Sequence, residues 1–273
     1  MKIVIDLQGL QRDGNRKRGI GRYSLEIVRH MIRDHPENKY ILVANGSLTD
    51  VRDEFIYELE NSQNVIYSKW FSPGPLGYMS NNAFLLNIGR SLKSFAFSCL
   101  HVDVVFVTSF FEGFSDNCLT EFDYNLLKTP VVSIFYDLIP LANKSLYLNR
   151  NLDFKSFYLS KVSKLQSFSG LLAISESSAM EAKNLIQYNP QRIFTISSAC
   201  NTNIFNTTDS NQDSFLLEQL SLVNYILYSG AGDPRKNIKS LLRSYSLLKR
   251  ELLLKYKLVF AGNLLKPEID LIN

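Results

Sequence analysis

Residues Ser229–Ile238, with the sequence SGAGDPRKNI, decide our interpretation of the fold. An apolar, β-prone run ends here, and two glycines precede a helical pattern. Asp233 suits a helix N-cap and Pro234 the first helical position. The free N–H groups and dipole of such a helix would face a bound anion, to which Arg235 and Lys236 would add positive charge. The stretch predicts a strand–turn–helix unit that binds phosphate; the alternative is a solvated loop with two surface cations.

The same alternation of strand and helix patterns extends through the rest of the chain. Short Val/Ile-rich runs separated by longer helical patterns are typical of a parallel sheet covered on both faces. The expected strands are 3–7, 40–44, 65–67, 104–108, 131–135, 171–174, 193–196, 225–229 and 256–261. The expected helices are 21–33, 50–60, 82–97, 154–168, 176–186 and a last one reaching about residue 250. We therefore predict an α/β fold.

A polar, turn-rich stretch divides this pattern into two parts. Residues 201–212 read as a linker between an N-terminal Rossmann-like domain, residues 1–200, and a second Rossmann-like domain that begins within 213–273. Two strands and a helix are too little for a self-sufficient α/β core. We therefore expect a fragment or a natural truncation of a longer protein.

Composition excludes several classes of protein. Apolar residues make up 45% and charged residues 21% of the chain, as in ordinary globular proteins, and the net charge of +4 comes from scattered basic residues that give no case for nucleic acid. The first apolar run stops at Asp6, too early for a secretion signal. Three scattered cysteines indicate a reducing, cytoplasmic setting. The three histidines have no metal-ligand spacing and no Asp-x-Asp triplet occurs, so we expect no metal.

A second glycine-rich stretch, RGIGRY at residues 18–23, enters the first long helix. Its glycines would let a substrate approach the backbone closely. A nicotinamide-binding fingerprint would need a third glycine and a loop directly after the strand, but Ser24 occupies the third position and eleven residues intervene. This spacing argues against an oxidoreductase and leaves a substrate loop or a flexible surface loop.

Asp137 follows the expected strand 131–135, where ligands of parallel sheets gather. Its carboxylate could orient a substrate hydroxyl or act as an acid or base. Alternatively, it caps the turn before Pro140. Ser175 with Glu176 is more typical of a structural helix N-cap.

Four segments together resemble one family in order and spacing. They are Gly19–Tyr23 (GIGRY), Tyr136–Pro140 (YDLIP), Ala173–Ser178 (AISESS) and Gly232–Asn237 (GDPRKN). The set resembles the family 4 glycosyltransferases of GT-B fold, and the bacterial mannosyl- and rhamnosyltransferases of polysaccharide assembly in particular. The resemblance implies an acceptor domain followed by a donor domain, transfer with retention of configuration, no metal, and a Glu-x7-Glu segment lying beyond Asn273.

The resemblance also assigns roles to residues. It implies catalytic roles for Asp137, Arg235 and Lys236, and donor binding by Gly19, Gly21, Arg22, Tyr136, Gly230, Gly232, Arg235 and Lys236. The cations would stabilise the negative charge that develops on the leaving diphosphate.

The implied activity moves a mannose- or rhamnose-like hexose from a nucleotide sugar to a glycan or lipid-linked acceptor for O-antigen or capsule. The expected location is the cytoplasm, with peripheral association at the inner face of the bacterial cytoplasmic membrane. A catalytically inactive, truncated scaffold protein is the alternative.

The expected helix 82–97 bears on that membrane association. It places Phe84, Ile88, Leu92 and Phe95 on one face, with Arg90 and Lys93 nearby. Such a face can rest on a membrane surface or pack into the core. We predict that it faces the core.

Overall fold

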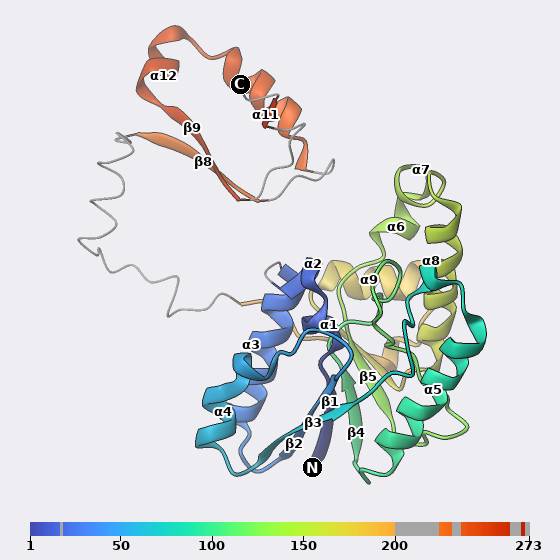
Figure 1. Cartoon of the computed structure of the whole chain (residues 1–273). Coiled ribbons are helices and arrows are strands. Elements are labelled where there is room, and N and C mark those ends of the chain that lie inside the picture. Colours follow the sequence, from blue (N-terminus) through green and yellow to red (C-terminus); the bar gives the residue numbers. More distant parts are fainter. Residues whose placement is uncertain (17–18, 200–223, 231–235, 263–268, 271–273) are drawn as a thin grey trace. The chain divides into compact units, whose positions relative to one another are not determined.

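The computed structural model describes residues 1–16, 19–199, 224–230, 236–262 and 269–270 (Figure 1). The chain divides into two compact units, Met1–Asn201 and Thr202–Asn273. The predicted linker, residues 201–212, lies outside the described residues.

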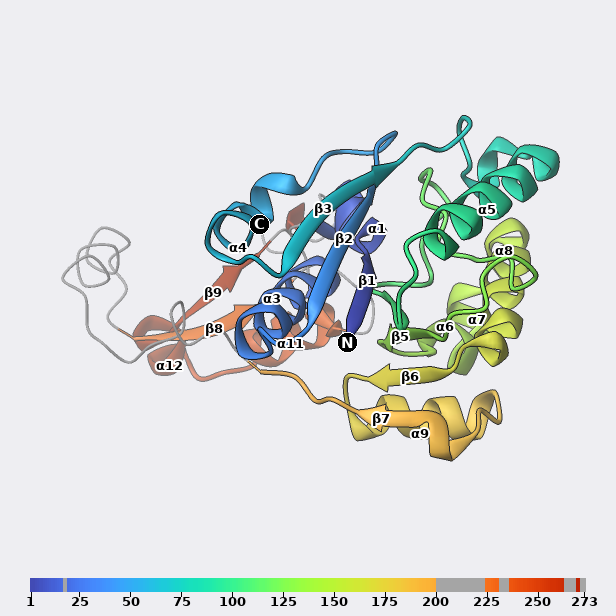
Figure 2. The same ribbon diagram turned by 90° about the horizontal axis from the view of Figure 1, so that it is seen from below.

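The first unit contains a sheet of seven parallel strands in the order β3-β2-β1-β4-β5-β6-β7 (Figures 1 and 2). The strands are β1 (Lys2–Asp6), β2 (Lys39–Asn45), β3 (Val65–Trp70), β4 (Val104–Val107), β5 (Val131–Phe135), β6 (Gly170–Ala173) and β7 (Ile193–Thr195). After β1, the chain adds β2 and β3 on one side of β1 and then β4 to β7 on its other side. The topological switch point of the sheet therefore lies between β1 and β4. Ligands of such sheets bind beside the carboxyl ends of the strands near this point.

Helices cover both faces of this sheet (Figure 1). The longer ones are α3 (Gly19–Asp34), α4 (Ile56–Asn61), α5 (Ala83–Ser98), α8 (Leu152–Lys164) and α9 (Glu176–Leu185), and the short ones are α1 (Gln8–Gln11), α2 (Asp13–Arg16), α6 (Ile139–Ala142) and α7 (Lys144–Tyr147). One apolar core joins α3 to one side of the sheet, and a second joins α5, α8 and α9 to the other. This confirms the predicted α/β fold class. The stretch expected as a long loop before α3 instead holds α1 and α2.

The second unit contains the parallel pair β8 (Tyr225–Ser229) and β9 (Lys257–Ala261), with α11 (Ile238–Ser246) and α12 (Arg250–Lys255). The single helix predicted to reach about residue 250 is wrong, because α11 ends at Ser246 and α12 starts separately. The expected helix start at Asp233 and Pro234 lies outside the described residues. Ile226 and Leu227 of β8 are exposed, so the described residues leave this apolar strand uncovered.

The prediction that the apolar stripe of α5 faces the core is wrong. The exposed fractions of Phe84, Leu92 and Phe95 are 75%, 48% and 59%, whereas Lys93 is completely buried. Both charged residues of the helix find partners inside the protein, since Arg90 pairs with Glu121 and Lys93 with Asp6. The helix is therefore turned with its cations inward and its aromatic stripe outward.

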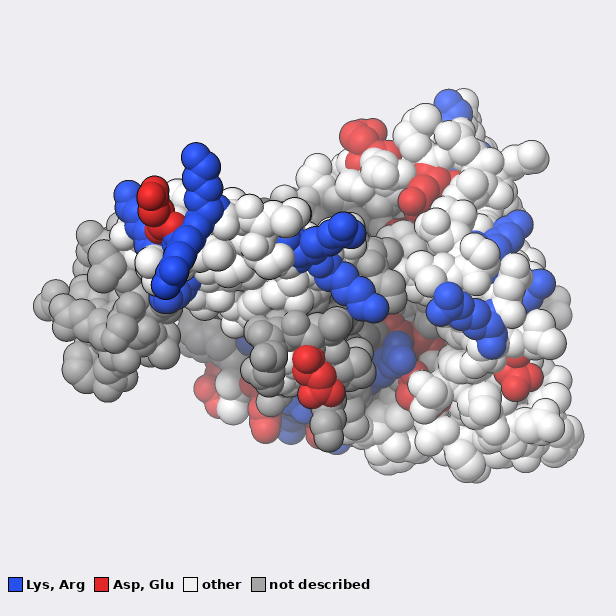
Figure 3. Space-filling model, turned by 90° about the horizontal axis from the view of Figure 1, so that it is seen from above, with Lys and Arg blue, Asp and Glu red and all other residues white. Residues whose placement is uncertain are grey.

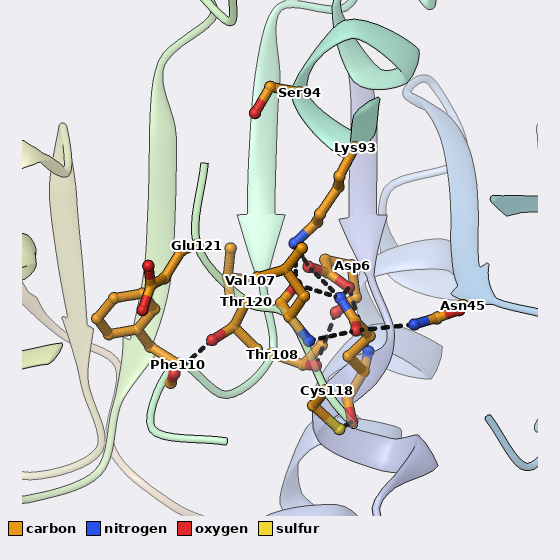
Figure 4. Close-up of polar contacts among 12 residues, drawn as sticks. Asp6, Asn45, Lys93, Ser94, Val107, Thr108, Phe110, Cys118, Thr120 and Glu121 are labelled. Carbon is orange, nitrogen blue, oxygen red and sulfur yellow. Dashed lines mark hydrogen bonds and ion pairs between the residues drawn. The ribbon is translucent and has the colours of Figure 1, made fainter. Parts of the chain in front are cut away.

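The pair between Asp6 and Lys93 lies at the carboxyl end of β1 (Figure 4). The Lys93 ammonium lies 2.5 Å from Asp6 Oδ2 and donates to the Leu119 carbonyl at 2.7 Å. The ammonium also lies 4.0 Å from the ring centroid of Phe122. Gln8 donates to both the Asp6 carboxylate and the Leu119 carbonyl. The buried ion pair thus ties α5, the start of α1 and the segment around Leu119 to the end of β1.

Lys93→Met should lower the free energy of unfolding by about 3–5 kcal/mol, because it leaves the buried Asp6 carboxylate without its cation. Urea denaturation of the variant measures this loss. Lys128→Met, at an exposed lysine, is the matched control and should stay within about 0.5 kcal/mol of the wild type. An equally small loss in both variants would show that the pair is dispensable.

A second charged cluster surrounds Glu121 between α5 and α8. Its carboxylate lies 2.6 Å from Arg90, 3.4 Å from Lys161 and 2.5 Å from Lys164. Burial alone would raise the pKa of Glu121, but Lys161, Lys164 and Arg90 outweigh it and lower the pKa to about 2. Because this is below the pKa of an unfolded glutamate, the carboxylate stabilises the fold above that unfolded value, and the stabilisation is lost as pH falls toward about 2.

The wild type should therefore lose on the order of 3 kcal/mol of stability through Glu121 as the pH falls from about 4.5 to about 2. Glu121→Gln should be less stable at neutral pH and should lack this part of the acid dependence. Denaturant unfolding across that pH range, with Asp153→Gln at an exposed acid as control, tests the assignment. Parallel pH profiles for the wild type and Glu121→Gln would contradict it.

Candidate functional site at the carboxyl edge of the first sheet

The ends of β4 and β5 and the start of α3 meet around the hydroxyl of Tyr136. This hydroxyl lies 2.8 Å from Ser24 Oγ, 3.2 Å from the Ile20 carbonyl and 3.3 Å from the Thr108 carbonyl. Burial raises the pKa of Tyr136, so its phenol stays protonated. The Tyr23 ring meets the Tyr136 ring edge-on, with centroids 5.9 Å apart. The start of α3 is thus fixed to the end of β5.

The two glycines of the GIGRY stretch lie inside α3 rather than in a loop before it. Gly19 is the first residue of the helix and is exposed, and Gly21 is buried. A Cβ atom added at Gly19 would meet no described atom within 4 Å. Packing would therefore tolerate a side chain at position 19. Glycine is needed there only if a ligand approaches the N-terminus of the helix.

Arg22 points to a different side from its neighbours Tyr23 and Ser24. Its side chain lines a pocket of about 230 Å³ together with Arg16, Glu54, Leu10, Leu25 and Val51. Arg16 lies 3.1 Å from Glu54, whereas Arg22 has no ion pair among the described residues. The structure does not bring Arg22 together with Tyr136, so its predicted donor contact stays a prediction.

Asp137 lies next to a carboxylate that the sequence did not single out. Asp137 Oδ1 accepts the N–H of Ile139 at 3.0 Å, and Glu181 Oε2, from α9, accepts the N–H of Leu138 at 2.6 Å. One oxygen of Asp137 therefore caps the turn, as the alternative interpretation expected. No sequence motif could have joined Glu181 to Asp137, because only the pairing of β5 with β6 brings α9 to this turn.

Ser175 is the N-cap of α9, as expected, and accepts the N–H of Ser178 at 3.1 Å. Ser178 in turn donates to the Tyr136 carbonyl at 2.5 Å. The serines of this segment therefore hold α9 against the end of β5 and position Glu181.

In the second unit, Gly230 and Lys236 are described, whereas Gly232 and Arg235 lie outside the described residues. Gly230 has a φ of +157° and donates its N–H to the Ala261 carbonyl at 3.0 Å. A Cβ atom at Gly262 would approach the Gly230 carbonyl to 2.0 Å, so the ends of β8 and β9 pass too closely for a side chain there. Lys236 is exposed just before α11.

On the face shown in Figure 3, Lys and Arg side chains lie in small groups separated by uncharged surface. Across the described ranges, no three His, Cys, Asp or Glu side chains are placed to hold a metal ion. No helix in the described part of the chain is long and apolar enough to cross a membrane.

The fold is of the kind found in GT-B glycosyltransferases. The crystal structure of HepE from Anabaena in complex with UDP and glucose superposes with a TM-score of 0.59 at 15% identity, covering 100% of this chain and 64% of that one. A glycosyltransferase from Rickettsia africae superposes with a TM-score of 0.51 at 13% identity, covering 96% of this chain and 68% of that one. These likenesses confirm the predicted GT-B-type α/β fold.

Sequence similarity points to mannosyltransferases. The serotype-specific mannosyltransferase WbdA of Escherichia coli is 30% identical over 99% of this chain and 32% of its own length. The O-antigen chain mannosyltransferase B of Escherichia coli is 34% identical over 36% of this chain and 26% of its own length. The chain thus spans about a third of the length of the WbdA sequence. No protein-family model matches the chain.

Proposed function

We propose that the protein is a hexosyltransferase that moves mannose, or the related rhamnose, from a nucleotide sugar to a glycan or lipid-linked acceptor in cell-surface polysaccharide synthesis. The observation that carries this proposal is the 30% identity to mannosyltransferase WbdA across 99% of the chain. The GT-B-type fold supports it, since HepE, which shares the fold, was crystallised with UDP-glucose. Family 4 membership and retention of configuration are part of the proposal.

In this proposal the second unit holds the donor diphosphate. Gly230 and Gly232 allow the diphosphate to approach the backbone, and Arg235 and Lys236 stabilise the charge that develops on it as the glycosidic bond breaks. At the first unit, Gly19 and Gly21 keep the start of α3 open. Asp137 orients the acceptor hydroxyl with the oxygen that Ile139 does not use. We propose that transfer needs no metal.

Lys236→Ala should lower the rate of transfer about 100-fold or more, because it removes a cation from the departing diphosphate. The assay incubates purified protein and EDTA with a mannose-containing acceptor and GDP-mannose, UDP-glucose or dTDP-rhamnose. Release of the nucleoside diphosphate and extension of the acceptor are both measured.

Lys239→Ala is the matched control, because Lys239 is also exposed and lies one turn further along, on α11. It should retain nearly the wild-type rate. Equal rates in the two variants would remove Lys236 from the mechanism. Failure of the folded wild type to turn over any donor would instead favour the inactive scaffold.

We also propose that the protein works in the cytoplasm, at the inner face of the membrane, and that α5 contacts the lipid surface. Its outward stripe of Phe84, Ile88, Leu92 and Phe95 carries no charge. An exposed, uncharged stripe with two phenylalanines suits the interfacial region of a bilayer.

Phe84→Ser with Phe95→Ser should weaken binding to vesicles of phosphatidylcholine and phosphatidylglycerol about tenfold or more, because each phenylalanine would bury apolar area in the lipid. Co-sedimentation measures the binding. Ile56→Ser with Tyr57→Ser, at exposed positions of α4, is the matched control and should bind as the wild type does. Unchanged co-sedimentation of the α5 variant, or a wild type that does not bind the vesicles, would refute the proposed contact between α5 and lipid.

A further inference from the structure

Three polar side chains from three different elements converge on the turn after β5. Asp137 lies in the turn itself, Glu181 comes from α9, and Tyr158 comes from α8. The sequence offers no motif that links them. They lie at the carboxyl edge of the sheet, where the proposed function places the acceptor.

The two carboxylates are held in place by backbone N–H groups rather than by cations. Leu138 donates to Glu181 Oε2 and Ile139 donates to Asp137 Oδ1. Neither carboxylate pairs with a lysine or arginine in the part of the chain that the structure describes. Each carboxylate has a second oxygen that takes no part in these two bonds and can accept a hydrogen bond. The two carboxylates make the local charge negative.

Tyr158 supplies a hydrogen-bond donor to the same place. Its ring stacks on Phe111 with centroids 4.9 Å apart, and the residue is only 4% exposed. Its hydroxyl is buried and has no hydrogen-bond partner among the described residues. Burial raises the pKa of Tyr158, and the charges of Asp137 and Glu181 raise it further, so the phenol stays protonated and both carboxylates lie within its electrostatic reach. A buried hydroxyl of this kind is normally paired. What distinguishes Tyr158 is the neighbouring pair of carboxylates, with which its hydroxyl forms a set of one donor and two acceptors for a ligand.

The chemistry of the three groups restricts what that ligand can be. Two unpaired carboxylates repel phosphate, so the donor diphosphate does not fit here. A metal site would need more ligands than this cluster offers, since no group of three acidic, His or Cys side chains occurs among the described residues. A neutral polyol, by contrast, donates hydroxyls to carboxylates and accepts from a phenol.

We propose that Asp137, Glu181 and Tyr158 form the subsite for the terminal sugar ring of the acceptor glycan, with Glu181 and Tyr158 as its specificity-determining residues. The proposal rests on the proposed glycosyl transfer for the identity of the sugar. It assigns acceptor specificity to Glu181 and Tyr158, which lie outside the segments that resemble the glycosyltransferase family.

The test titrates the purified chain with α-linked mannotriose in the absence of donor and follows binding by ligand-observed NMR. Tyr158→Phe and Glu181→Gln each preserve shape and remove one hydrogen-bonding group or charge. Each should weaken mannotriose binding about tenfold. Thermal unfolding of each variant verifies that it remains folded.

Tyr124→Phe is the matched control, because Tyr124 also has a buried hydroxyl without a hydrogen-bond partner among the described residues but lies near Glu121 instead. It should bind mannotriose as the wild type does. Wild-type affinity in both Tyr158→Phe and Glu181→Gln would overturn the subsite, as would a folded wild type that does not bind mannotriose up to about 10 mM. Because no donor is present, these outcomes are independent of whether transfer occurs.

Discussion

The buried ion pair between Asp6 and Lys93 is the constraint on which the first unit depends. Both side chains are at most 1% exposed, and together they join β1, α5 and the segment around Leu119 at the switch point of the sheet. A buried ammonium is tolerated only where a carboxylate and carbonyls replace water. The position of Lys93 thereby fixes the rotation of α5, and the aromatic stripe on its other side must face outward.

The residues assigned to the two substrates differ in charge and belong to different units. Asp137 and Glu181 leave unpaired acceptors beside the turn after β5. The cations assigned to the diphosphate belong to the second unit, where Lys236 stands exposed before α11. Hydroxyls of a neutral sugar suit the first environment and phosphate suits the second, so charge alone sorts the two substrates proposed for this protein.

Much of the fold could be predicted because β-branched runs such as Val131–Phe135 mark buried parallel strands directly. The rotation of α5 about its axis could not be predicted, because periodicity locates an apolar stripe but does not tell which side of the helix packs on the sheet. In the sequence, Lys93 looks like a surface residue until its buried partner Asp6 is known. Asp137 was predictable from its place after a strand. Glu181 and Tyr158 were not, because only the pairing of β5 with β6 and the packing of α8 assemble them.

The hydroxyl of Tyr158 has no partner among the described residues, and this has a free-energy cost that the fold does not need to bear. A buried polar group without a partner destabilises a protein by about 1–3 kcal/mol, and phenylalanine would keep the stacking on Phe111 without that cost. Tyr136, directly after β5, is a buried tyrosine without this cost, because its hydroxyl has three partners within 3.3 Å. Tyr136 is thus a tyrosine satisfied within the fold, whereas Tyr158, which packs on the other side of the sheet, has an unsatisfied hydroxyl among the described residues. The hydroxyl of Tyr136 holds the end of β5 to α3, and we propose that the hydroxyl of Tyr158 serves a bound ligand.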